Sequence, residues 1–549
     1  AASEPLMNGA GRCSHGDVDA AAAGRRFAVH CGADAGRLAA VAEWLLRGGG
    51  ELSAKIEARI ADAEPGRRRV FASESLRAGE RLLVVPQECL VKPLHSLCNL
   101  EAEVENNEDA SSEQSSVLGE NVRLVARLLR DGARHDCENT ETAKSFFAAY
   151  YATLPKDVDI PVTWHPAEVR NLVGSRALAR ILTQRKRLKA QYAALVACGM
   201  GFDGISWDDF LWASCVVSSR CFSNDGMPCL VPIGDLIDHH PAANSKVSYG
   251  LEAGRFVYSC VADIAAGEEI LIAYGLLDNI TLLVKYGFLL AGCNEDAEGC
   301  SVDEVVFTLP RQEFCPWKLR LLKAAGYAAD RAQVVAIATC ERNVMELMSM
   351  LRVVACDAAD IDAAQSSPQG APESAHDLRC AVSLQCEKRM LAILWCLSAV
   401  VARGTPQREQ LVATPAGWEM AEQNFAPAVA AALNLLRGQS PVKISGSMAP
   451  SAAPRTHLED ESPVNVDTTQ RHAAMAKALL ESERRAAEPF MALAATAGAV
   501  LALEASEQTA CLPSLARAAP LEGLGSGWRR FVADYVRELC RQLSPQLSA

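Results

Sequence analysis

The sequence contains no Cys-x-x-Cys pair among its 20 cysteines, so neither a zinc knuckle nor a thioredoxin-like redox motif is readable. A disulfide framework is not expected in so long a chain without an evident secretory signal, and the thiols are predicted to be reduced and packed. Positive charge is also in deficit, because 54 Lys and Arg face 67 Asp and Glu, a formal net charge of −13. This balance argues against a nonspecific nucleic-acid binder and favours basic protein partners only weakly.

Long apolar runs are missing as well. The longest uncharged, apolar-rich run covers Pro489–Leu503, which is shorter than the roughly 20 residues of a membrane-spanning helix. No repeat of fixed period marks a solenoid, and no paired carboxylates or Cys/His set mark an obvious acid–base or nucleophilic site. For this chain of 549 residues, half of them hydrophobic, we expect two or three domains, a large core, and no membrane, metal or nucleic-acid partner.

Residues 230–290 contain what the rest of the chain lacks, namely polar and aromatic side chains at successive chain reversals. Residues 247–251 and 256–260 alternate in character on either side of a turn, which predicts a β-hairpin. The next strand is expected to end at Gly275. Tyr274 would then occupy its last position, where a hydroxyl can face a cleft.

A short helix is predicted after this strand. Asp278 is a suitable N-cap, and Gly287 suits the C-terminal end. The pattern alone leaves two interpretations of Tyr274 and Tyr286. They are either site residues or half-buried aromatics anchored by their hydroxyls.

Several ordered motifs surround this segment. They are Trp44-Leu45, Arg77-Ala78-Gly79-Glu80, Val85-Pro86, Phe146 to Leu154-Pro155, Trp164, Ser219-Arg220-Cys221-Phe222, Leu230-Val231-Pro232, Asp235, His239, Gly267-Glu268-Glu269, Tyr274-Gly275, Asn279 and Tyr286-Gly287-Phe288. In this order and spacing the sequence resembles the SET-domain methyltransferases. More narrowly, it resembles the branch that contains RuBisCO large-subunit methyltransferase and relatives that act on non-histone proteins. The likeness covers residues 40–290 well and residues 300–490 more loosely.

The resemblance implies an α+β fold. A SET β-fold would occupy residues 36–295 and would be split by a helical insertion at about 117–205. An all-α substrate-binding domain would follow over residues 300–500. Helical spacing of apolar residues in the insertion and after Pro310 agrees with this expectation.

Three further segments have separate expectations, two at the ends of the chain and one loop within residues 36–295. Residues 1–35 should be disordered or weakly ordered, and the acidic, Ser-rich residues 101–116 should form a flexible loop. Residues 501–549 should form a C-terminal tail with an amphipathic helix, which we expect to dock on the protein itself. The apolar residues that recur every four positions in this helix are Phe531, Tyr535, Leu539 and Leu543.

The resemblance implies S-adenosylmethionine as cofactor and methyl transfer to the side-chain nitrogen of a lysine in a non-histone protein. The protein is expected to be monomeric and cytoplasmic, with the nucleus or chloroplast as alternatives. Tyr274 would be catalytic, because its oxygen would orient the amine and stabilise the polarised methyl group. The implied cofactor-binding residues are Gly66, Arg67, Arg68, Arg69, Arg220, Asp235, Asp238, His239, Tyr274 and Phe288. The implied substrate-binding residues are Ser219, Arg220, Tyr286 and Phe288.

Two positions depart from the family pattern. Arg67-Arg68-Arg69 stands where a Gly-x-Gly loop is usual, with Gly66 displaced, and Asp238 stands where Asn is expected. Bulky side chains at the first position could narrow the cofactor entrance, and a carboxylate at the second removes an amide donor. These departures keep open the alternative of a SET-derived protein-binding module that has lost turnover. A second alternative, a protein-histidine methyltransferase, stays open because some relatives in the resembled branch methylate histidine.

Overall fold

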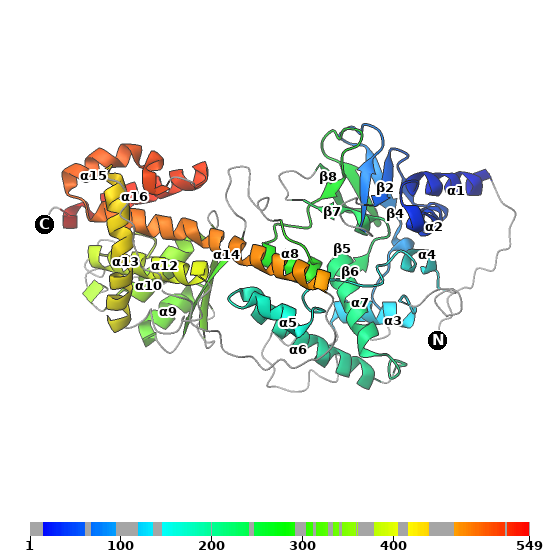
Figure 1. Cartoon of the computed structure of the whole chain (residues 1–549), viewed down its shortest axis with the longest axis horizontal. Helices are drawn as coiled ribbons and strands as arrows, with labels where there is room; N and C mark the ends of the chain where they lie inside the picture. The colour runs from blue at the N-terminus through cyan, green and yellow to red at the C-terminus, as the bar shows by residue number, and fades with distance from the viewer. Residues whose placement is uncertain are drawn as a thin grey trace. The chain divides into compact units, whose positions relative to one another are not determined.

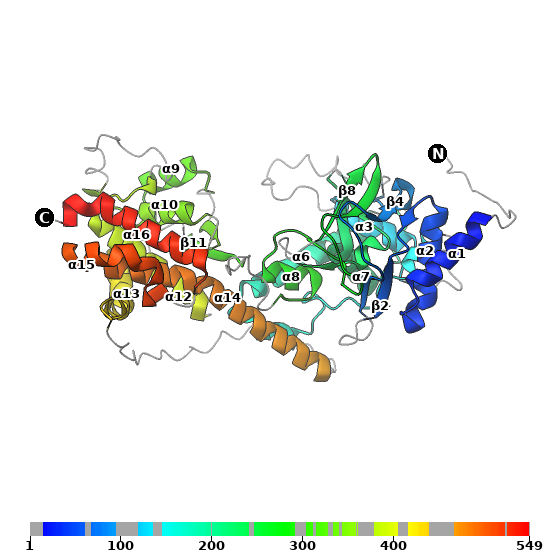
Figure 2. The ribbon, with the colours of Figure 1, turned by 90° about the horizontal axis from the view of Figure 1, so that it is seen from above.

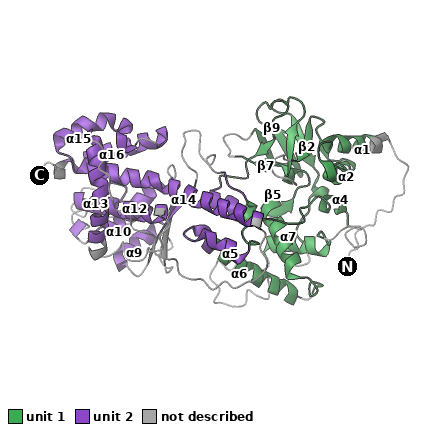
Figure 3. Cartoon of the chain, in the orientation of Figure 1, with its two compact units in different colours: residues 1–164, 180–276, 284–287 green, residues 165–179, 277–283, 288–549 purple. Residues whose placement is uncertain are grey.

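The chain forms two compact units (Figure 3). The first consists of residues 1–164, 180–276 and 284–287, and the second of residues 165–179, 277–283 and 288–549. The domain boundary predicted between residues 295 and 300 lies outside the described part of the chain. The computed structural model describes residues 15–60, 67–94, 119–134, 145–198, 200–224, 226–240, 246–290, 303–310, 314–327, 333–339, 343–357, 359–360, 378–403, 415–438, 466–521 and 524–547. No helix in these stretches is long and apolar enough to cross a membrane.

The first unit begins with two helices, α1 (His15–Phe27) and α2 (Ala35–Arg47), which pack against each other (Figure 1). This corrects the expectation of weak order for residues 15–35, whereas residues 1–14 lie outside the described residues. The alanine-rich sequence of α1 shows no clear apolar face. In the structure, however, Phe27 and Cys31 are fully buried in the core. Burial of such side chains stabilises a helix whose own pattern is weak.

A mixed sheet holds the centre of the first unit, with strand order β1-β4-β9-β8-β10-β7. Its strands are β1 (Glu51–Leu52), β4 (Arg81–Val85), β9 (Arg255–Cys260), β8 (Val247–Glu252), β10 (Leu271–Ile272) and β7 (Asp238–His239). The predicted hairpin is confirmed, because β8 and β9 pair antiparallel over their whole length. Strand β10 runs parallel to both β7 and β8. The chain therefore leaves β7 and β10 at the same edge of the sheet.

Two antiparallel ribbons complete the β-structure of this unit. The first joins β2 (Ile56–Ile60) to β3 (Arg68–Ala72), and the second joins β5 (Cys221–Asn224) to β6 (Met227–Leu230). Strand β3 also bonds to the segment before β10, since Ile270 N donates to Val70 O at 2.8 Å. This contact fixes the arginine-rich strand close to the edge where β7 and β10 end.

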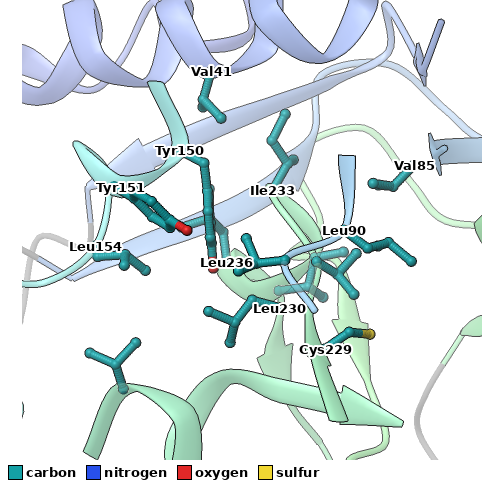
Figure 4. Close-up of a cluster of buried hydrophobic side chains, with 14 of the residues drawn as sticks. Val41, Val85, Leu90, Tyr150, Tyr151, Leu154, Cys229, Leu230, Ile233 and Leu236 are labelled. Carbon is teal, nitrogen blue, oxygen red and sulfur yellow. The ribbon is translucent and has the colours of Figure 1, made fainter. Parts of the chain in front are cut away.

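Helices interrupt the β-structure as predicted. They are α3 (Glu120–Arg130), α4 (Ala148–Tyr151), α6 (Arg176–Ala197) and α7 (Trp207–Arg220). The helical part extends to residue 220, beyond the predicted limit near 205, and the predicted loop 101–116 lies outside the described residues. Helix α4 turns Tyr150 into the apolar core, where it lies in one cluster with Ile233 and Leu236 (Figure 4).

The second unit is largely helical. Its helices are α5 (Pro166–Val169), α8 (Asn279–Tyr286, shared with the first unit), α9 (Pro316–Ala324), α10 (Val344–Ala355), α12 (Leu384–Arg403), α13 (Pro415–Leu436), α14 (Val466–Leu501), α15 (Ala505–Cys511) and α16 (Ser526–Leu547). Helix α12 packs against α13 and α14 (Figure 2). The all-α expectation needs one correction, because β11 (Val305–Pro310) and β12 (Gln333–Ala338) form an antiparallel pair. Both strands are short and rich in β-branched residues, which favour extended backbone.

The C-terminal residues belong to this second core. Helix α16 buries Trp528, Val532, Tyr535 and Leu539, so the predicted docking of an amphipathic helix on the protein itself is confirmed. Residues 501–521 and 524–547 are thus part of the second unit rather than a tail. Short 3-10 turns connect the longer elements of both units. They are η1 (Gly32–Asp34), η2 (Gln87–Cys89), η5 (Arg170–Leu172), η6 (Gly234–Leu236), η10 (Leu512–Arg517) and η11 (Ala519–Leu521).

Candidate active site

Tyr274 lies at the edge of the sheet where β7 and β10 end. The predicted strand is shorter than expected, because β10 ends at Ile272 and Tyr274 follows two residues later instead of being its last residue. Its backbone N–H donates to Nδ1 of His239 at 3.1 Å, and its hydroxyl donates to the carbonyl oxygen of Ile237 at 2.8 Å. Both partners belong to β7 or precede it directly, so the parallel pairing of β7 and β10 sets the position of the phenol. The Tyr274 side chain is partly buried.

Two rings flank the Tyr274 ring. The His239 imidazole stacks on it with centroids 5.0 Å apart, and the Tyr286 ring lies 4.9 Å away at 40°. Tyr286 is the last residue of α8, and Gly287 follows it with φ 79°. A Cβ at residue 287 would lie 2.2 Å from the carbonyl oxygen of Asp159, so the predicted glycine at this helix end has a steric reason.

The start of α8 also follows the prediction. The Asp278 carboxylate accepts a hydrogen bond from the backbone N–H of Thr281 at 2.9 Å, which is the N-cap arrangement. The next residue, Asn279, is buried within the second unit, where its amide donates to Asp303 and Ser482. Asn279 therefore anchors the helix in that unit.

The protonation states of these rings follow from their surroundings. Burial raises the pKa of Tyr274 well above its usual value, and the nearby negative charge of Asp238 adds to the effect. Burial likewise lowers the pKa of His239, whose Nδ1 already accepts a hydrogen bond. Tyr274 is therefore a neutral phenol at physiological pH, and its oxygen retains lone pairs that can accept a contact from a substrate nitrogen.

Arg220 and Asp235 form a partly buried ion pair beside this edge. Nη1 of Arg220 donates to both Oδ2 and the backbone oxygen of Asp235, at 3.1 and 3.0 Å. The Tyr150 hydroxyl donates to the same carboxylate oxygen at 3.0 Å. Although burial opposes its charge, Asp235 and Tyr150 together raise the pKa of Arg220. The side chain of Asp235 is only 3% exposed, so in this structure it is a buried acceptor, and its implied cofactor-binding role stays a prediction.

An unusual turn delivers Asp235 to this pair. Ile233 adopts φ 66°, which is costly for a β-branched residue, on the order of 1–3 kcal/mol. A Cβ at the next residue, Gly234, would lie 2.3 Å from the hydroxyl oxygen of Tyr258. Neither the turn nor the Tyr150 contact was predicted, and in the sequence only the glycine hints at the close approach.

Asp238 and the arginine triplet at residues 67–69, which both depart from the family pattern, contact each other. Asp238 forms ion pairs with Arg67, at 3.0 Å to Nη2, and with Arg69, at 3.4 Å to Nε. Nη1 of Arg69 also donates to Glu269 at 3.3 Å. Burial raises the pKa of Asp238 despite the two arginines, and likewise that of Glu269. The carboxylate that replaces an expected Asn is thus a partner for arginines that replace expected glycines.

Arg68 differs from its two neighbours. It is the first residue of β3 and is partly buried, with Ile60 as its cross-strand partner. Successive side chains of a strand point to opposite faces, and Arg67 and Arg69 both reach Asp238. Burial lowers the pKa of Arg68, and the charge of Arg220 lowers it further.

The remaining predicted residues are placed as follows. The Ser219 hydroxyl donates to the carbonyl oxygen of Cys215 at 2.8 Å, one turn back in α7. Phe288 belongs to the second unit, and Gly66 lies outside the described residues. The substrate-binding roles of Ser219 and Phe288 and the cofactor-binding role of Gly66 stay predictions.

Most of the site, though not Tyr286, lies within a segment that matches a known family. Residues 67–275 match the SET domain. The chain is 26% identical over 254 residues to an actin-histidine N-methyltransferase of Canis lupus familiaris, which covers 41% of this chain and 38% of the relative. It is 26% identical over 229 residues to the chloroplastic ribulose-1,5-bisphosphate carboxylase/oxygenase large subunit N-methyltransferase of Pisum sativum. This second match covers 38% of this chain and 44% of that relative. The chain thus spans less than half the length of these curated relatives.

Two solved structures share the fold. The SET domain of LSMT bound to lysine and AdoHcy gives a TM-score of 0.56 at 18% identity, covering 90% of this chain and 96% of that one. Rubisco LSMT bound to AdoMet gives 0.56 at 19% identity, covering 86% and 95%. At this level of identity the likeness supports the fold.

Proposed function

Since this chain is a SET-domain protein of the branch that includes the Rubisco large-subunit and actin-histidine methyltransferases, we propose that it transfers a methyl group from S-adenosylmethionine to a side-chain nitrogen of another protein. The observation that carries the proposal is the position of Tyr274. Its hydroxyl proton is committed to Ile237, and its ring lies between those of His239 and Tyr286. The Tyr274 oxygen is thereby left as an oriented acceptor just beyond the end of β10.

The residues at this edge fit such a cofactor. S-adenosylmethionine supplies a methyl group on a sulfonium, which is electrophilic without help from a metal or a base. Arg68 and Arg220 would provide cationic groups for the amino-acid end, and β7, the last strand of the sheet, would bring the backbone of His239 to the cofactor. The charged pair of Asp238 with Arg67 and Arg69 would form one wall.

Methyl transfer to lysine then depends mainly on how the amine is positioned relative to the methyl group. A lysine amine must be neutral to attack, and from a reference pKa of about 10.4 its deprotonation at pH 7 costs roughly 4–5 kcal/mol. An apolar channel and an adjacent positive charge both lower that pKa. Alignment of the amine with the methyl group can supply on the order of 7–11 kcal/mol. Tyr274, as a neutral acceptor, would hold the amine in line rather than remove its proton.

Lysine is our proposed target, because the similar LSMT structure is bound to lysine. Histidine is the second candidate, because a curated relative is named an actin-histidine N-methyltransferase. The two differ in their dependence on pH. Imidazole, with a reference pKa near 6.5, is already mostly neutral at pH 7. Methylation of histidine should therefore level off above about pH 7, whereas methylation of lysine should keep rising toward pH 9. The test uses kcat/KM, which reports the protonation state of the free substrate and not that of the bound one. A kcat/KM that is flat from pH 7 to pH 9 contradicts the lysine assignment.

Labelling a cell extract is the direct experiment. The protein and isotopically labelled S-adenosylmethionine are incubated with the extract, and mass spectrometry identifies the modified side chain. Purified actin and Rubisco large subunit serve as defined test substrates. Calorimetry of cofactor binding distinguishes an active methyltransferase from the remaining alternative, a SET-derived binding module without turnover. Such a module should give no heat at high micromolar S-adenosylmethionine.

A further inference from the structure

Two cysteines of the second unit lie in contact inside its core. Sγ of Cys356 and Sγ of Cys386 are 3.3 Å apart, and both side chains are fully buried. Cys356 follows directly after α10, and Cys386 lies in the first turn of α12. The two residues are 30 positions apart in the sequence, so they belong to no short metal-binding motif. The packing of two helices therefore brings together a thiol pair that the sequence did not predict.

A carboxylate lies beside this thiol pair. The ligand atoms of Asp360, Cys356 and Cys386 all lie within 4.8 Å of one another, and all three residues are buried. Among the residues that the structure describes, no other group of three His, Cys, Asp or Glu side chains has this arrangement. Two sulfurs and a carboxylate oxygen are ligands that zinc accepts, and thiolates favour zinc over magnesium or calcium.

Hydrogen bonds hold the Asp360 carboxylate in place. Its Oδ1 accepts from the hydroxyl of Ser383 at 2.6 Å, and its Oδ2 accepts from the backbone N–H of Asp357 at 3.0 Å. The Ser383 hydroxyl oxygen also accepts from the backbone N–H of Cys386 at 2.9 Å, which links the carboxylate to the helix of one thiol. Of the described residues, only Ser383 bonds to Oδ1, so this oxygen keeps a lone pair for a metal ion. Such outer contacts are typical of carboxylates that bind metals.

Two cations near the thiol pair can offset the charge of the ligands. Two thiolates and one carboxylate carry three negative charges, against two positive charges on a zinc ion. Nη1 of Arg389 lies 3.5 Å from Oδ2 of Asp360, and the buried Lys318 ammonium donates to the carbonyl oxygen of Val354, in the last turn of α10. The two thiol protons leave to solvent as the sulfur–metal bonds form. Because a divalent ion then replaces two protons, the buried group does not gain a charge.

The distance between the sulfurs suits a shared metal ion better than a disulfide. Two thiolates on a tetrahedral zinc ion, each about 2.3 Å from it, lie about 3.8 Å apart. The observed 3.3 Å would have to increase by about 0.5 Å to reach that value. A disulfide would require a decrease to about 2.05 Å, which is more than twice as large a change. The smaller change favours the metal ion.

We propose that Cys356, Cys386 and Asp360 bind a zinc ion that joins the end of α10 to the beginning of α12. This inference goes beyond the proposed function and does not depend on it. The fourth position of a tetrahedral ion is left to water or to another ligand. Because all three ligands are buried in the core of the second unit, the role of the ion is structural. Its binding should stabilise this unit, since metal affinity adds to the free energy of folding.

Cobalt(II) titration of the reduced, metal-free, full-length protein tests the inference. Cobalt should give sulfur-to-cobalt charge-transfer bands in the near ultraviolet, and zinc should abolish them because it binds more tightly. The bands should be lost in Cys356→Ser and in Cys386→Ser. Asp360→Asn leaves both thiols in place and should weaken cobalt binding about tenfold or more.

Cys396→Ser is the matched control, because Cys396 is another buried thiol of α12 and its Sγ donates to the carbonyl oxygen of Ala421 at 3.7 Å. This variant should keep the bands of the wild type. Their absence from the wild type, or their persistence in both variants of the thiol pair, overturns the inference. So does a Cys356–Cys386 disulfide, detected by peptide mass spectrometry in protein purified without an oxidant.

Thermal unfolding gives a second measurement for the case in which a cysteine variant does not fold. Zinc should raise the melting temperature of the metal-free wild type and of Cys396→Ser, and it should raise that of Asp360→Asn less. A wild-type melting temperature that zinc leaves unchanged contradicts a structural metal site. None of these outcomes bears on methyl transfer, so the proposed function is tested separately.

Discussion

Two arginines, one in each unit, show opposite uses of the same side chain. Arg352 of the second unit is 1% exposed and forms a two-bond ion pair with Glu387, which is itself fully buried. Its remaining donors reach the backbone oxygens of Leu378 and Arg379 and the hydroxyl of Tyr535. Arg68 of the first unit is partly buried and has no such partner among the described residues.

The difference in hydrogen bonding distinguishes an arginine with a structural role from an arginine that is available to a ligand. Arg352 joins α10, α12 and α16 with every donor direction used, and despite its burial Glu387 and Tyr535 raise its pKa. A group so fully satisfied has no capacity left for a ligand. No described residue satisfies the donors of Arg68 in this way. The comparison can be broken or sharpened at four positions.

The largest effect is expected in the second unit. Glu387→Ala leaves the Arg352 charge buried and unpaired, which should lower the free energy of unfolding by about 3–5 kcal/mol. Urea unfolding followed by circular dichroism measures this loss. The double variant with Arg352→Met and Glu387→Met should recover much of it, because both charges are removed together. A single variant as stable as the wild type would show that the pair is not structural.

The next effect concerns activity alone. Tyr274→Phe removes one oxygen, so methyl transfer should fall at least roughly tenfold while the melting temperature changes little. Tyr249→Phe is the matched control, because its hydroxyl donates to Ala273 O at 3.2 Å, in the same region of the sheet. Initial rates with labelled cofactor make the comparison. Full turnover in Tyr274→Phe would end the assignment of this residue.

A smaller effect is expected at Tyr150. Tyr150→Phe removes a donor from the buried Asp235 carboxylate and leaves Arg220 as its remaining side-chain partner. We expect a loss of about 1–3 kcal/mol in unfolding free energy. Chemical denaturation provides the measurement, and Tyr151→Phe, which takes a neighbouring donor from Asp131, is the comparison. A Tyr150→Phe protein of unchanged stability would contradict a structural role for the contact.

The smallest effect is expected at Arg69. Its pairs with Asp238 and Glu269 are partly exposed, so Arg69→Gly should cost no more than about 1 kcal/mol of stability. If side-chain bulk narrows the cofactor entrance, the same change should tighten S-adenosylmethionine binding by a few-fold in calorimetry. Unchanged affinity would rule out bulk as an obstacle.

Local patterns in the sequence were sufficient for parts of the fold and the site. Alternation of side chains gave the β8–β9 hairpin, and the capping residue Asp278 gave the start of α8. The placement of Tyr274 close to a strand end also followed from its neighbours, although β10 ends two residues before it. Each of these features depends on residues close in sequence, where periodicity and capping carry the information.

Contacts between distant residues could not be predicted in this way. Tyr150 meets Asp235 from a helix 85 positions earlier, and Arg67 and Arg69 meet Asp238 across the sheet edge. Helix α1 was not predicted, because its many alanines show no clear apolar face in the sequence. In the structure Phe27, at the end of this helix, is buried. Such pairings arise from packing, which a single sequence does not encode in any local pattern.

The close approach of Gly234 to Tyr258 has a use beyond this chain. Only a hydrogen atom fits as the side chain of residue 234, so any other residue there would displace the ring of Tyr258. This turn therefore does not tolerate a series of small substitutions. Residue 234 is therefore a simple criterion for sorting related genes: those with glycine at this place can keep the Asp235 geometry, and those without it must have rebuilt this corner of the protein.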